Sequence, residues 1–210
     1  MDKTLRDAER SGDSAKLLRE RLKVGEIDRE IVILAARLGH PGANALFPVE
    51  VMTDALDTVF LGASSAIGVQ GRVRLLADWA EAVADLWSFE YPKDGRPKAA
   101  VEAARAWADC PCPDHLAVAT AARTAAQAAL GVANAMLADA DWLDEESAEY
   151  SRFYARRAIR AAALAASAAS ATTGADVHRD LIAAFERAEE DEGEWQRLRL
   201  AGYLLGEIKW

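Results

Sequence analysis

The sequence predicts an all-α protein: an antiparallel multi-helix bundle of closely packed, alanine-rich helices with a short helical N-terminal module. Apolar residues recur at helical spacing, no long stretch alternates apolar and polar residues, and β-branched residues are scattered along the chain. The 210 residues are 51% hydrophobic and 28% charged, so the chain can bury a core. Because much of the apolar content is alanine, we expect the helices to gain stability from close approach.

Residues 1–46 are predicted to form the N-terminal module, a set of short antiparallel helices. Asp13 or Ser14 can cap its second helix, and Asp28 precedes the third. The sequence "GHPG" at 39–42 is a stop followed by a restart. We expect helices over 3–10, 15–23 and 29–38, with Ile31, Ile33, Leu34 and Leu38 as a buried stripe.

Residues 47–210 are predicted to form the alanine-rich bundle, with short loops between antiparallel helices. We expect helices over 49–61, 69–89, 97–108, 114–138, 146–171 and 177–190, and a closing helix in "GEWQRLRLAGYLLGEIKW". One face of the 69–89 helix should be buried, namely Val73, Leu76, Ala80, Val83 and Trp87. The six tryptophans supply bulk that alanine lacks, so we expect most of them to pack in or beside the core.

The net charge of −9 restricts the classes of partner. A duplex nucleic-acid binder needs cations to neutralise phosphates, so we expect no nucleic-acid partner. The N-terminal residues contain no apolar signal-peptide core, and we find no apolar run long enough to cross a bilayer, which favours a cytoplasmic protein without a membrane partner. The sequence leaves the oligomeric state open, a homodimer included.

Two acidic clusters, each beside a tryptophan, are candidate partner-binding surfaces for a basic protein. The alternative is that they are solvated loops and helix starts, where carboxylates complement the helix dipole. An Mg²⁺–diphosphate clamp is disfavoured, because neither cluster has the DDxxD spacing. The candidate residues are Asp139, Asp141, Trp142, Asp144, Glu145 and Glu146 in the first cluster, and Glu189, Glu190, Asp191, Glu192 and Trp195 in the second.

Motifs for catalysis or metal binding are missing from the sequence. The histidines do not form HExxH, and there is no GxSxG, no glycine-rich phosphate loop and no cysteine paired with a nearby histidine. Cys110 and Cys112 supply two thiolates where a structural zinc site needs four ligands, so we expect a loop with two reduced cysteines. We therefore predict no catalytic residue, no metal and no cofactor.

The segment "GRPKAAVEAARAW" at 95–107 predicts a helix whose charges oppose its dipole. Pro97 suits the first helical position, yet Arg96 and Lys98 lie at the positive end, and Asp109 lies at the negative end. We infer that the cations are kept for tertiary contacts, with Arg96 and Arg105 reaching carboxylates on an adjoining helix.

The same segment also carries a family resemblance. Together with "ATAARTAAQAA", "YARRAIRAAALAASAA" and "EWQRLRLAGYL", the stretch "YPKDGRPKAAVEAARAW" resembles immunity protein family five, over about residues 73–204. That family is associated with bacterial polymorphic toxin systems. Its histidines in the alanine-rich helices are replaced here by Thr120, Thr124 and Gln127. The matching residues, which we interpret first as architectural, are Asp94, Arg96, Pro97, Glu102, Arg105 and Trp107.

The resemblance implies a non-catalytic immunity protein that binds a cognate toxin and blocks it by occlusion. The acidity of the chain suggests that this toxin is basic. The alternative hypothesis is a helical scaffold or adaptor of a bacterial defence or signalling system, and an enzyme ranks third.

Overall fold

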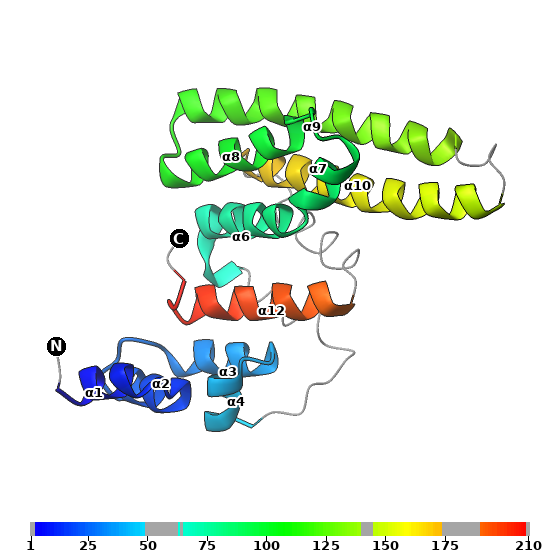
Figure 1. Cartoon of the computed structure of the whole chain (residues 1–210). Coiled ribbons are helices and arrows are strands. Elements are labelled where there is room, and N and C mark those ends of the chain that lie inside the picture. The colour runs from blue at the N-terminus through cyan, green and yellow to red at the C-terminus, as the bar shows by residue number, and fades with distance from the viewer. Residues whose placement is uncertain (1–2, 49–62, 64, 140–144, 174–189, 209–210) are drawn as a thin grey trace. The chain divides into compact units, whose positions relative to one another are not determined.

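The predicted all-α fold is confirmed by the computed structural model, which describes residues 3–48, 63, 65–139, 145–173 and 190–208. These residues form ten helices and no strand (Figure 1). The predicted helices over 49–61 and 177–190 lie outside the described residues. The chain divides into two compact units, one made from the described parts of Met1–Gly68 and Ala188–Lys209, the other from those of Val69–Arg187.

The first unit combines four N-terminal helices with the C-terminal helix. Its elements are α1 (Lys3–Ser11), α2 (Ser14–Lys23), α3 (Arg29–Arg37), α4 (Pro41–Leu46) and α12 (Glu190–Leu204). α2 packs against α1 and α4, while α3 packs against α4 and α12. The sequence analysis placed the domain boundary between residues 46 and 47 and assigned the C-terminal helix to the second domain. In the structure, α12 belongs to the same unit as the N-terminal helices.

Specific polar contacts close this unit. Asp13 caps α2 by accepting from the Lys16 amide at 3.0 Å. His40 caps α4 through Nδ1, which accepts from the Ala43 amide at 3.3 Å, and its Nε2 lies 3.1 Å from a Glu207 carboxylate oxygen. The His40 ring therefore joins the start of α4 to the residues after α12.

The predicted buried stripe of the third helix is partly wrong. Leu38 is buried, but Ile31, Ile33 and Leu34 are only half-buried. The buried face instead runs through Val32, Ala35 and Ala36. The reason is that α4 and α12 both pack against α3, and small residues allow that close approach.

The second unit is the alanine-rich bundle. Its helices are α6 (Gly68–Ala82), α7 (Ala84–Glu90), α8 (Arg96–Asp109), α9 (Pro113–Asp139) and α10 (Glu145–Ala171). α9 packs against α8 and α10, and α10 also packs against α8 and α7. The interior is lined by alanine, including on α10 the seam Ala155, Ala158, Ala162, Ala165 and Ala169. This spacing of three and four residues keeps one face of α10 small enough for close packing.

The single helix predicted over 69–89 is wrong, since it divides into α6 and α7 at Val83 (φ −109°, ψ 4°). The five residues of its predicted buried face are nevertheless all buried. The break redirects α7, whose Trp87 donates from Nε1 to the Asp94 carbonyl at 2.8 Å and stacks on Tyr91 with ring centroids 4.3 Å apart. A β-branched residue such as valine is stiff in a helix, which suits this position to the break.

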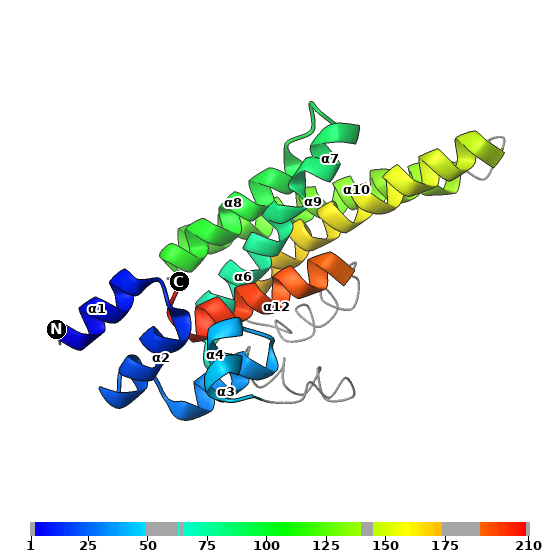
Figure 2. The same ribbon diagram turned by 60° about the horizontal axis from the view of Figure 1, so that its bottom comes forward.

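The two longest helices form a hairpin that extends beyond α7 and α8 (Figure 1, Figure 2). Each has 27 residues, which corresponds to about 40 Å of helix. By length and composition alone, the Pro113–Ala138 part of α9 is the one described stretch that could cross a bilayer, so the prediction of no such run is wrong by this criterion. Mostly buried core helices of globular proteins meet the same criterion, whereas only 22% of this stretch of α9 is buried, where it packs against α8 and α10.

Candidate protein-binding surface

The six residues that carry the family resemblance lie just before α8 and along it. Asp94 precedes the helix, accepts from the Arg96 amide at 3.1 Å, and forms a bidentate ion pair with the Arg96 guanidinium. These hydrogen bonds hold the pKa of Asp94 below its usual value. The pKa of Arg96 is raised, again chiefly by the hydrogen bonds to Asp94. The cation at the positive helix end is therefore neutralised locally, and the prediction that Arg96 reaches an adjoining helix is wrong.

Arg105 does reach an adjoining helix, as predicted. Its Nη2 lies 2.6 Å from an Asp78 oxygen and 2.6 Å from a Glu81 oxygen, both on α6. The Asp78 side chain is only 9% exposed, whereas the Glu81 side chain is 61% exposed, so water is excluded from the Asp78 carboxylate but not from that of Glu81. The hydrogen bonds to Glu81 and Asp78 outweigh desolvation and raise the pKa of Arg105. At the far end of α8, Asp109 pairs with Arg74 of α6, which accounts for an acid at that position.

The other motif residues fit the same architectural interpretation. Pro97 is buried at the beginning of α8, and Trp107 is half-buried. Glu102 is exposed. Five of the six motif residues thus form the helix start, cross-link α8 to α6 or pack, and only Glu102 faces solvent.

The first acidic cluster flanks the tip of the α9–α10 hairpin. Asp139 is the last residue of α9, and Glu145, which is exposed, is the first residue of α10, followed by Glu146. Asp141, Trp142 and Asp144 lie outside the described residues. The last residue of α9 and the first residue of α10 lie at the end of the hairpin that extends beyond α7 and α8 (Figure 2).

The second acidic cluster begins α12, in the first unit. Glu190, Asp191 and Glu192 are the first three residues of α12, and Glu189 lies outside the described residues. Trp195 is 38% exposed, and the Arg199 guanidinium lies 5.9 Å from its ring centroid. Gln196, the next residue, is fully buried. Trp195 is therefore the one aromatic anchor of the two predicted clusters whose side chain the structure describes.

A third surface, which the sequence analysis missed, is an exposed aromatic group on α7 and α10. Phe89 is 66% exposed and stacks on Tyr154, with ring centroids 5.3 Å apart. Phe153 is 50% exposed and meets Tyr154 edge to face at 5.2 Å. The Arg157 guanidinium covers the Phe153 ring at 5.0 Å from its centroid. We call Phe89, Phe153, Tyr154 and Arg157 the aromatic patch.

The position of Phe153 in the sequence could have indicated that it lies at the surface. The inward seam of α10 begins at Ala148 and continues through Ala155 and Ala158, and Phe153 falls outside its spacing. A large aromatic residue outside the seam of an alanine-rich helix is a candidate surface anchor. That Phe89 joins it depends on the break at Val83, which the sequence did not predict.

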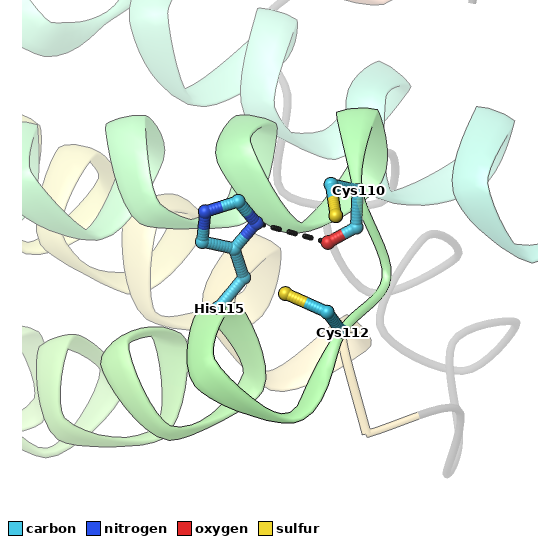
Figure 3. A group of neighbouring side chains, drawn as sticks. All are labelled: Cys110, Cys112 and His115. Atoms are coloured by element: carbon cyan, nitrogen blue, oxygen red, sulfur yellow. Dashed lines mark hydrogen bonds between the residues drawn. The ribbon is translucent and has the colours of Figure 1, made fainter.

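A histidine side chain lies beside the two cysteines, which the sequence analysis did not predict. Cys110 and Cys112 are free thiols, and His115 lies beside both, so the expectation that no cysteine has a nearby histidine is wrong (Figure 3). The hydrogen bond from the His115 amide lowers the pKa of Cys112. The contact with Cys112 raises the pKa of Cys110. A short turn between two helices brings the three residues together.

The chain was compared with known proteins at three levels. No family model, curated protein or solved structure matches it.

Proposed function

We propose that this chain is a non-catalytic immunity protein that binds a cognate basic toxin and blocks it by occlusion. The observation that carries the proposal is the aromatic patch, which exposes two phenylalanines on the unit that also contains Asp139 at the end of α9 and Glu145 at the start of α10. Large exposed aromatic side chains with charged surroundings are typical anchors of protein interfaces. The net charge of −9 favours a positively charged partner.

The resemblance to immunity protein family five supports the same proposal. Its most specific segment, residues 94–107, maps onto an intact helix start and a cross-link between helices. These residues stabilise the bundle, which leaves the aromatic patch and the acidic residues as the surface for a partner. Burying the exposed parts of Phe89 and Phe153 would contribute about 1–2 kcal/mol each, a factor of about 5–30 in Kd.

The test is co-expression with the toxin encoded by the adjacent gene, with growth and complex formation as readouts. We expect the wild-type chain to form a complex and restore growth, and the Phe89→Ala, Phe153→Ala double variant to protect poorly. Val118→Ala is the matched control, since Val118 is 56% exposed on α9, outside the patch. A toxin that forms no complex with the wild-type chain would refute the proposal.

A second candidate function, an adaptor, is favoured by the separate compactness of the first unit. Deleting residues 1–46 is an unsuitable test, because α12 would lose its packing against α3. A surface change is cleaner: Trp195→Ala should release an adaptor's partner while toxin neutralisation persists. If Trp195→Ala abolishes neutralisation while Phe89→Ala and Phe153→Ala neutralise the toxin as the wild type does, α12 would be favoured as the docking helix instead.

A further inference from the structure

The turn between α8 and α9 brings together three side chains that commonly bind metals. One ligand atom from each of Cys110, Cys112 and His115 lies within 4.8 Å of the others (Figure 3). In a tetrahedral zinc site with Zn–S bonds of about 2.3 Å, two sulfurs are about 3.8 Å apart. The side chains therefore need to close by only about 1 Å to hold one ion.

The local backbone explains why the three residues meet. α8 ends at Asp109, Cys110 is extended (φ −142°, ψ 93°), and Pro113 is the first residue of α9. The Cys112 amide donates to the Cys110 carbonyl at 2.7 Å, which closes the turn. His115 lies in the first turn of α9, and helical side chains lean toward the N-terminus, so its ring extends back over the two cysteines.

Hydrogen bonds also set the state of the imidazole. Nδ1 of His115 lies 2.9 Å from the Cys110 carbonyl oxygen. Since a carbonyl oxygen only accepts, Nδ1 is the donor in this contact. The ring is half-buried at the protein surface, so it has room to rotate and direct a nitrogen toward the sulfurs.

We propose that Cys110, Cys112 and His115 form a binding site for one Zn²⁺ ion, with the fourth position open to water or to a partner's side chain. On binding, each thiol gives its proton to solvent as a sulfur–zinc bond forms, the imidazole stays neutral, and nothing is oxidised or reduced. Two thiolates and one imidazole suit zinc among the divalent ions. Cys110 is exposed and the other two residues are half-buried, so the ion can enter from solvent.

The test is titration of the reduced full-length chain with Co²⁺, a spectroscopic substitute for zinc, followed by displacement with Zn²⁺. We expect one ion per chain, with thiolate-to-cobalt charge-transfer bands and the visible bands of a tetrahedral site. The variants Cys110→Ser, Cys112→Ser and His115→Gln should each bind at least about tenfold more weakly. Glu102→Gln, an exposed carboxylate earlier on α8, is the control and should bind as the wild type does.

A second measurement separates metal binding from folding. Zn²⁺ should slow alkylation of both cysteines in the wild-type chain and in Glu102→Gln, but not in His115→Gln, while circular dichroism shows all of them folded. Absence of thiolate bands in the reduced wild-type chain would overturn the proposal. The proposal would also be overturned if the three ligand variants bound the ion as tightly as the wild type, because the ion would then lie elsewhere. Formation of a Cys110–Cys112 disulfide, with no metal uptake by the reduced chain, would overturn it as well.

Discussion

Replacement of Arg105 by methionine tests the architectural interpretation of the family motif. Arg105 contacts Asp78 and Glu81 at 2.6 Å each, and Asp78 has almost no access to water. Removing one partner of a fully buried ion pair costs about 3–5 kcal/mol, because the other charge stays buried. Arg105 is 33% exposed and Glu81 is 61% exposed, so water screens part of this loss. We therefore expect a loss of about 2 kcal/mol in the free energy of unfolding.

Thermal unfolding followed by circular dichroism provides the assay. For a chain of this size, a loss of about 2 kcal/mol lowers Tm by about 4–8 °C. Arg156→Met, which removes an exposed arginine from α10, is the matched control and should change stability by less than about 0.5 kcal/mol. Adding Asp78→Met to Arg105→Met should recover part of the loss, with a coupling energy above about 1 kcal/mol. An Arg105→Met variant as stable as the control, or additive effects of the two changes, would refute the reasoning.

The remaining predictions concern packing and pH. In Gly42→Ala the new Cβ would lie 2.5 Å from the Ser14 Cβ and 3.0 Å from its backbone carbon, so urea denaturation should show a loss of about 1–3 kcal/mol. Gly131 occupies an exposed position on α9 with nothing within 4 Å of an added Cβ, so Gly131→Ala should instead gain about 0.5–1 kcal/mol, and the same sign for both variants would contradict the packing described. The pKa of Asp94 is lowered in the folded state, so its stabilising effect is complete above the unfolded value and is lost as the pH falls through the folded value. Asp94→Asn should therefore be less stable than the wild type at neutral pH and no less stable in acid, and a difference that persists in acid would count against the Asp94–Arg96 pair.

The helices were predictable where propensity and spacing agree. The ends of α2, α8 and α10 fall within one or two residues of the prediction, because Asp13, Pro97 and the loops around them give clear local signals. The break at Val83 was not predictable, since the apolar spacing continues from α6 into α7 and the contact between Trp87 and Asp94 that accompanies it is a tertiary interaction.

The candidate surfaces depend even more on tertiary structure. Charge and tryptophan positions led to the acidic clusters, but Phe89 reaches Tyr154, next to Phe153, only because α7 packs against α10. Similarly, the sequence shows two cysteines and a histidine in six residues, yet their convergence follows from the turn at Pro111 and the direction of the first turn of α9. Local patterns therefore predicted the elements, and the contacts between elements decided the sites.

The most direct test of the proposed binding role is the affinity of the purified chain for its cognate toxin, measured with surface variants at two ionic strengths. We expect Phe89→Ala and Phe153→Ala to weaken Kd by about 5–30-fold each, Val118→Ala to leave it within about threefold, and added salt to slow association. Equal affinity of all three variants and the wild type, with association insensitive to salt, would contradict capture of a basic protein by the aromatic patch.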